Sequence, residues 1–87
     1  MDKGKKQEII SKYELHEGDT GSTEVQVALL TERISELTGH VVANRHDYST
    51  QRGLLRLVVQ RRRLLSYLSK EDVGRYHKLI ASLGLRK

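Results

Sequence analysis

The feature that most constrains the fold of this 87-residue chain is the spacing of its apolar residues. They recur at intervals of three and four, which places them along one face of a helix, and proline, the strongest helix breaker, is absent. A chain of this length forms one small core, and it shows neither a linker nor an internal repeat. We therefore predict an all-α fold with a single domain over residues 1–87.

Four helices are expected. The first covers roughly residues 4–14 and is only weakly apolar, so the sequence leaves open whether it packs against the rest or swings free. The second opens at Thr23, where "TEVQ" fits a capping box in which Thr23 and Gln26 each satisfy a free backbone N–H. The third runs from about residue 49 to residue 70, with leucines and valines along one arc.

A short polar turn, "NRHDYS", joins the second and third helices, which must therefore lie antiparallel as a long hairpin. A short fourth helix, capped by Asp72 and ended by Gly84, is expected to cover the apolar seam of that hairpin with Tyr76 and its neighbours. Arg61 falls among the leucines of the third helix, so we expect its guanidinium to reach an acid or a carbonyl.

Charge is divided unevenly along the chain. Residues 1–51 carry six Lys/Arg against nine Asp/Glu, a balance of −3, whereas residues 52–87 carry ten against two, a balance of +8. A basic half on a small domain indicates a polyanionic partner, nucleic acid before an anionic membrane surface. The absence of cysteine, of a secretory signal and of any membrane-length apolar run favours an intracellular protein with no membrane partner.

Helical wheels place two polar tracks along the hairpin. Arginine on such a track favours phosphate, whose oxygens match the guanidinium fork. On the second helix the track recurs every seven residues: Gln26, Arg33 and His40. On the third helix the track lies within about 60° of arc opposite the core face: Arg52, Arg56, Arg63, Tyr67 and Lys70.

Polar loops lie at both ends of the hairpin. "GDTGST" has the small residues of an anion-holding loop before a helix N-terminus, and it fits a tight turn with a capped helix equally well. At the other end His40, Asp47 and Thr50 come together. Hydrolysis is not expected there, because a solvent-facing turn has no oxyanion site and no walled pocket. Helix capping by Asp47 and a donor–acceptor cluster for the RNA minor groove both fit.

Four stretches in order, "GDTGSTEVQVALLTERI", "HD" followed by "RGLL", "QRRRLLSYL" and "RYHKLIASLGLR", resemble the bacterial small-subunit ribosomal protein S15 family. The resemblance covers nearly the whole chain. It implies a non-enzymatic protein of the cytoplasmic ribosome, monomeric when free. Its four helices would bind the central domain of 16S ribosomal RNA at a three-way junction and a nearby minor groove. Further implied partners are the neighbouring platform proteins and large-subunit RNA across an intersubunit bridge.

The same resemblance assigns residues to the two RNA sites. Two departures stand out: Thr50 replaces the usual serine, and Lys70 replaces an arginine and so loses a bidentate phosphate grip. The minor-groove contacts would come from His40, Asp47 and Thr50. The junction contacts would come from Thr20, Gly21, Thr23, Gln26, Arg63, Tyr67 and Lys70.

Two other classes of function were weighed against RNA binding. A helical module for an acidic protein partner would need an apolar face left over, and both long apolar stripes are used by the core. A DNA-binding domain would place the end of one helix in a major groove, whereas these tracks run lengthwise. The four histidines show no ligand spacing, so no metal and no cofactor are expected.

Overall fold

The structure, a computed structural model, describes residues 3–14 and 21–85, and within these ranges it contains four α-helices and no strand. None of the described helices combines the length and apolarity that crossing a membrane requires. The predicted all-α fold is confirmed, and the helix boundaries lie within one residue of those expected. The helices are α1 (Lys3–Tyr13), α2 (Thr23–Ala43), α3 (Tyr48–Glu71) and α4 (Val73–Leu83).

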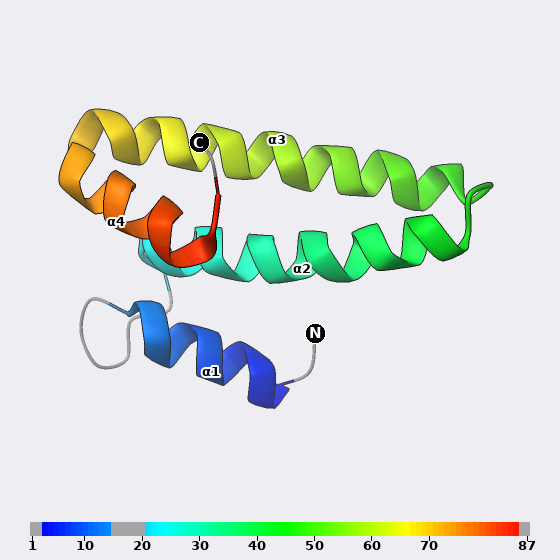
Figure 1. Ribbon diagram of the computed structural model, residues 1–87, viewed down its shortest axis with the longest axis horizontal. Coiled ribbons are helices and arrows are strands. Elements are labelled where there is room, and N and C mark those ends of the chain that lie inside the picture. The colour runs from blue at the N-terminus through cyan, green and yellow to red at the C-terminus, as the bar shows by residue number, and fades with distance from the viewer. Residues whose placement is uncertain (1–2, 15–20, 86–87) are drawn as a thin grey trace.

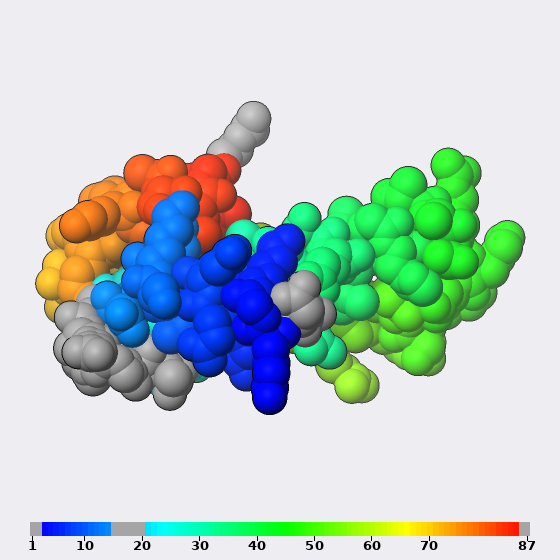
Figure 2. All heavy atoms as spheres, turned by 90° about the horizontal axis from the view of Figure 1, so that it is seen from below, coloured from blue at the N-terminus to red at the C-terminus, as the bar shows by residue number. Residues whose placement is uncertain are grey.

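The predicted hairpin forms the body of the molecule (Figure 1). Helices α2 and α3 run antiparallel, α4 folds back across the end of the hairpin that is far from the turn, and α1 lies along the side of α2 that faces away from α3. The tip of the hairpin extends beyond both short helices (Figures 1 and 2). One stretch of paired helix is therefore left uncovered for contacts with a partner.

The core joins three helices. Val27 of α2, Leu65 and Leu68 of α3 and Leu79 of α4 form one buried cluster. Burying a side chain of this size contributes roughly 1.5–3 kcal/mol to folding. Val27, Leu65 and Leu68 lie on the apolar faces that the periodicity predicted, and Leu79 lies on the same face of α4 as Tyr76. The expected residues Tyr76, Ile80 and Leu83 are half-buried around it.

The N-cap of α2 differs from the prediction. Ser22, not Thr23, has the extended backbone of a cap (ψ 158°), and its hydroxyl accepts a hydrogen bond from the Val25 N–H at 3.3 Å. With the cap one residue earlier, Gln26 cannot close a capping box. Its Nε2 instead donates to the carbonyl of Gly21 at 2.7 Å. The helix begins where expected, but a different hydroxyl caps it.

The ends of α4 agree with the prediction. The Asp72 carboxylate accepts from the Arg75 N–H at 3.1 Å, which caps the helix. Gly84 ends it in the left-handed conformation (φ 70°), which glycine adopts without strain.

Arg61 lies at the α2–α3 seam, as the wheel predicted, but its partner is neither an acid nor a carbonyl. Its Nη1 donates to the hydroxyl oxygen of Thr31 at 3.3 Å, and that hydroxyl donates to the Val27 carbonyl at 2.8 Å. Partial burial lowers the pKa of Arg61. The prediction failed because Thr31 is 30 positions away, so that only the packing of the two helices brings it to Arg61.

Helix α1 packs against the hairpin, which answers the question that the sequence left open. Ile10 is buried, Lys5 forms an ion pair with Glu32 of α2, and the Tyr13 hydroxyl lies 2.8 Å from the hydroxyl of Ser82 in α4. Burial of Ile10, packing of Tyr13 against the core and polar contacts to α2 and α4 thus hold this weakly apolar helix in place.

A bidentate ion pair between Arg75 and Glu24 joins α4 to α2. Glu24 is only 8% exposed, and its two carboxylate oxygens accept from Nε and Nη2 of Arg75 at 2.6 and 2.5 Å. The hydrogen bond to Glu24 raises the pKa of Arg75. Planar, parallel bonds of this kind are the strongest geometry available to arginine and a carboxylate.

Replacing Arg75 with methionine should lower the free energy of unfolding by about 1–3 kcal/mol, because the buried Glu24 carboxylate would lose its partner. Urea unfolding followed by circular dichroism measures the change. Lys78→Met, which removes an exposed cation from the same helix, is the matched control. Equal stabilities for the two variants would mean that the ion pair does not hold α4.

Candidate nucleic-acid interface

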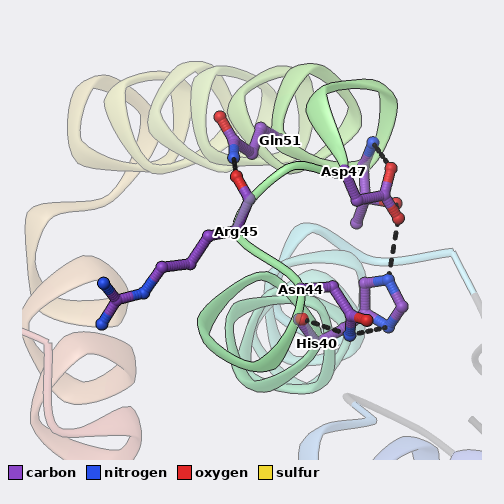
Figure 3. Close-up of polar contacts among 6 residues, drawn as sticks. His40, Asn44, Arg45, Asp47 and Gln51 are labelled. Carbon is purple, nitrogen blue, oxygen red and sulfur yellow. Dashed lines mark hydrogen bonds and ion pairs between the residues drawn. The ribbon is translucent and has the colours of Figure 1, made fainter.

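Asp47 organises the turn at the tip of the hairpin (Figure 3). It is the N-cap of α3: its Oδ1 accepts from the Thr50 N–H at 3.1 Å. Its Oδ2 accepts from the Thr50 hydroxyl at 2.7 Å and lies 2.8 Å from Nε2 of His40 on α2. The predicted helix cap is therefore confirmed, and the same carboxylate brings His40 and Thr50 together. Contact of this cluster with an RNA minor groove stays a prediction.

The imidazole of His40 is held from both sides. Asp47 contacts Nε2, while the side-chain nitrogen of Asn44 lies 3.5 Å from Nδ1 and donates to the His40 carbonyl at 2.9 Å (Figure 3). Asn44 also ends α2 through its backbone N–H. This role of Asn44 was not predicted, although its place in a turn rich in capping residues was a signal for it.

Further contacts make the turn rigid. The Gln51 side chain donates to the Arg45 carbonyl at 2.8 Å (Figure 3), and the rings of His46 and Tyr48 meet edge to face. Because backbone and side chains are fixed together, the His40–Asp47–Thr50 cluster is preorganised for a ligand.

The hydrogen bonds also set the charge of the cluster. Bonding to the Thr50 hydroxyl, and then to His40, lowers the pKa of Asp47 from 3.8 to about 2. The lowered pKa keeps the carboxylate ionised in more acidic solution than an ordinary aspartate, and the carboxylate accepts bonds from both neighbours. Thr50 bonds to the carboxylate and not to the imidazole, so the nucleophile–base pair of a hydrolase is missing. The cluster is suited to binding a hydrogen-bond donor, not to hydrolysis.

Parts of the two polar tracks lie next to each other on the hairpin. All eight of their side chains are exposed, as predicted. Gln26 and Arg33 of α2 line a depression together with Gln60 of α3, and Gln60 lines a second depression with Arg56 and Arg63. Gln60 thus connects the tracks. It was not among the predicted residues, although its position seven residues before Tyr67 was a signal for it.

Basic side chains of this surface are not paired within the protein. In the described ranges, none of the cations of the two tracks has an ion pair with another side chain. They are Arg33, Arg52, Arg56, Arg63 and Lys70. Tyr67 is 55% exposed beside them, so its ring is available for contact with a partner.

The start of α2 adds small polar groups at the other end of the hairpin. Gly21 and Thr23 directly flank the capping residue, and a Cβ at Gly21 would meet no atom within 4 Å. The Gly21 backbone is therefore open to close approach. Thr20, the remaining predicted junction residue, lies outside the described residues.

The hairpin and its polar side define a small helical binding protein. It carries exposed cations along the hairpin, amides towards one end and a carboxylate–imidazole–hydroxyl cluster at the other. These features are typical of proteins that recognise the backbone and grooves of folded RNA.

Comparison with known proteins agrees with this class. Residues 6–86 match the model of the family described as Ribosomal protein S15. The small ribosomal subunit protein uS15 of Caldanaerobacter subterraneus subsp. tengcongensis is 58% identical over 87 residues, which is 100% of this chain and 99% of the relative. The protein of that name from Clostridium botulinum (strain Hall) is 56% identical, with 100% of both chains covered.

This chain belongs to the ribosomal protein S15 family. The family consists of structural, non-enzymatic proteins of the small subunit of the cytoplasmic ribosome, and binding ribosomal RNA is a general property of its members. The resemblance inferred from the sequence motifs is thereby confirmed.

Replacing Thr50 with valine should raise the pKa of Asp47 from about 2 towards 3.8, because the hydroxyl is the largest cause of the shift. The folded protein binds this proton less readily than the unfolded chain. The stabilisation from Asp47 is therefore complete above about pH 4 and is lost as the pH falls through about 2.

An NMR titration of the Asp47 carboxyl carbon measures this shift. Thr38→Val is the matched control, because the Thr38 hydroxyl bonds to the Ile34 carbonyl and does not touch Asp47. A pKa of Asp47 that stayed near 2 in Thr50→Val would show that another group keeps the carboxylate ionised.

Proposed function

We propose that this protein binds the central domain of 16S ribosomal RNA and holds a three-way junction and an adjacent minor groove in one geometry. Family membership supports this target, and the arrangement of the polar side of the hairpin supports the mode of binding. The observation that carries the proposal is the Asp47-centred cluster at one end of a side whose two polar tracks adjoin through Gln60.

The cluster suits a minor groove for a chemical reason. The RNA minor groove is shallow and displays 2′-hydroxyl groups and the edges of the bases, and guanine contributes an amino donor there. Asp47 stays ionised and can accept from such donors, while Thr50 and His40 hold it in place. Thr50 retains the hydroxyl function of the usual serine, so the donor to Asp47 is preserved.

The three-way junction of the RNA would contact the end of the hairpin at which α2 begins, and the two polar tracks. Arginine and lysine supply phosphate contacts that position RNA, and the Tyr67 ring offers a surface for an unstacked base or a sugar. In this proposal the junction residues are Thr20, Gly21, Thr23, Gln26, Arg33, Arg63, Tyr67 and Lys70, and Arg52 and Arg56 add phosphate contacts.

Two further partners follow from the same proposal. By ordering the junction, the protein would organise the subunit platform for neighbouring proteins, and the tip of the hairpin would contribute to a bridge with large-subunit RNA. The uncovered tip beyond α1 and α4 is the part of the described structure that supports such a second contact (Figure 1).

Replacing His40 with alanine should weaken binding to central-domain RNA by about 1–3 kcal/mol, because Asp47 would lose the partner that orients it. Filter binding measures the affinity, and a footprint on the same RNA locates the loss. His77→Ala, an exposed histidine on α4, is the matched control. Equal affinities of the two variants would remove the cluster from the interface.

Replacing Arg56 with alanine should weaken binding to all RNA uniformly and reduce the slope of log K against log salt by about one, because one phosphate contact is lost. Arg62→Ala on the flank of the same helix is the control, since Arg62 lies outside the track. A scrambled duplex serves as the non-specific RNA. A slope unchanged from that of the original protein would mean that Arg56 is only solvated.

A further inference from the structure

A depression lies where α1, α2 and α3 meet, on the side of the hairpin that carries the polar tracks. Its volume is about 370 Å³. We call it the three-helix notch. It is lined by Lys6 from α1, by Gln26, Leu29, Leu30 and Arg33 from α2, and by Gln60 from α3.

The polar groups of the notch are not used within the described protein. Lys6, Arg33 and Gln60 have no hydrogen bond or ion pair there, and Gln26 uses its amide nitrogen on the Gly21 carbonyl, which leaves its carbonyl oxygen as an acceptor. Neighbouring residues differ: Lys5 pairs with Glu32 and Arg61 bonds to Thr31. Side chains from three helices thus line the same depression, and no hydrogen bond or ion pair joins these side chains to one another.

The lining combines three kinds of chemistry. Leu29 and Leu30 are half-buried and give an apolar wall, Gln26 and Gln60 present amides, and Lys6 and Arg33 add two positive charges. A free phosphate would leave the leucines without a role, and an apolar ligand would leave the cations without one. A flat heterocycle joined to a phosphate uses all three, because its face packs on apolar groups, its edge bonds to amides and its phosphate pairs with cations.

The size and surroundings of the notch narrow the ligand to RNA. Its volume of about 370 Å³ falls in the range of sites for single small ligands, which fits one nucleotide. Gln60 also lines the adjoining depression with Arg56 and Arg63, so a backbone leaving the notch would pass directly onto the basic track. Specific RNA recognition usually targets unpaired bases that can be turned out of the stack.

We propose that the three-helix notch receives one unpaired nucleotide of the bound RNA. The base packs against Leu29 and Leu30, its edge bonds to the amides of Gln26 and Gln60, and its phosphate pairs with Lys6 and Arg33. This inference rests on the proposed RNA-binding function and adds Lys6 and Gln60 to the interface. It also makes α1 part of the binding surface through Lys6.

The first test uses Gln60→Met in the full-length chain. Gln60 is exposed and has no partner in the described protein, so the change should leave the fold intact. Affinity for central-domain RNA should fall about threefold to tenfold, as for the loss of one neutral hydrogen bond. Gln7→Met, an exposed amide of α1 outside the notch, is the matched control. Thermal denaturation of both variants checks the fold.

A second arm identifies the nucleotide. Chemical acylation of 2′-hydroxyl groups should show one unpaired nucleotide that the original protein and Gln7→Met protect and Gln60→Met exposes, with the remaining footprint unchanged. Removing the base of that nucleotide should abolish the difference in affinity between Gln60→Met and the original protein, because a double-mutant cycle reports direct coupling. Lys6→Met, on a different helix, should expose the same nucleotide.

The outcomes separate the two proposals. If the original protein binds central-domain RNA but Gln60→Met and Lys6→Met behave like Gln7→Met, the notch is not a nucleotide site and the proposed function stands. If Gln60→Met still lowers the affinity for the abasic RNA, the proposal of a nucleotide site in the notch would also be wrong. If the original protein binds central-domain RNA no better than a scrambled duplex, the proposed function itself fails.

Discussion

The apolar seam between α2 and α3 is the constraint on which the rest of this molecule depends. Val27, Leu65 and Leu68 are buried where the seam meets Leu79 of α4, and the burial of such side chains is the main favourable term in folding a small domain. Only when the seam has formed do the polar residues of the two helices lie on one side. The short helices then attach to this frame by a few contacts, chiefly Arg75 with Glu24 for α4.

At the turn, the same carboxylate serves the stability of α3 and the surface proposed to bind RNA. Asp47 starts α3 by capping its N-terminus, and its second oxygen holds His40 and Thr50. A residue with both duties cannot be exchanged without altering both the helix and the surface. The same hydrogen bonds lower the pKa of Asp47. The turn therefore needs no ligand to take up its binding geometry.

The sequence predicted most of this fold, because helical periodicity and caps are local signals. It predicted four helices, the antiparallel hairpin and the exposure of both polar tracks. It failed where the answer depends on packing. Ser22 and Thr23 both carry a capping hydroxyl, and only the backbone conformation decides between them. The contact of Arg61 with Thr31, and the depression that both Lys6 and Gln60 line, depend on how separate helices pack. The RNA contacts themselves remain predictions.

The hydrogen bond between Arg61 and Thr31 affects how α2 and α3 are aligned along their length. Leucine stripes alone tolerate sliding, because one apolar turn resembles the next. The hydrogen bond from Arg61 to the Thr31 hydroxyl favours one alignment, since sliding by a turn would break it. The separation between Gln26 and His40, about 21 Å along α2, is thus tied to fixed positions on α3. The polar groups at the two ends of the hairpin are therefore held at a fixed separation.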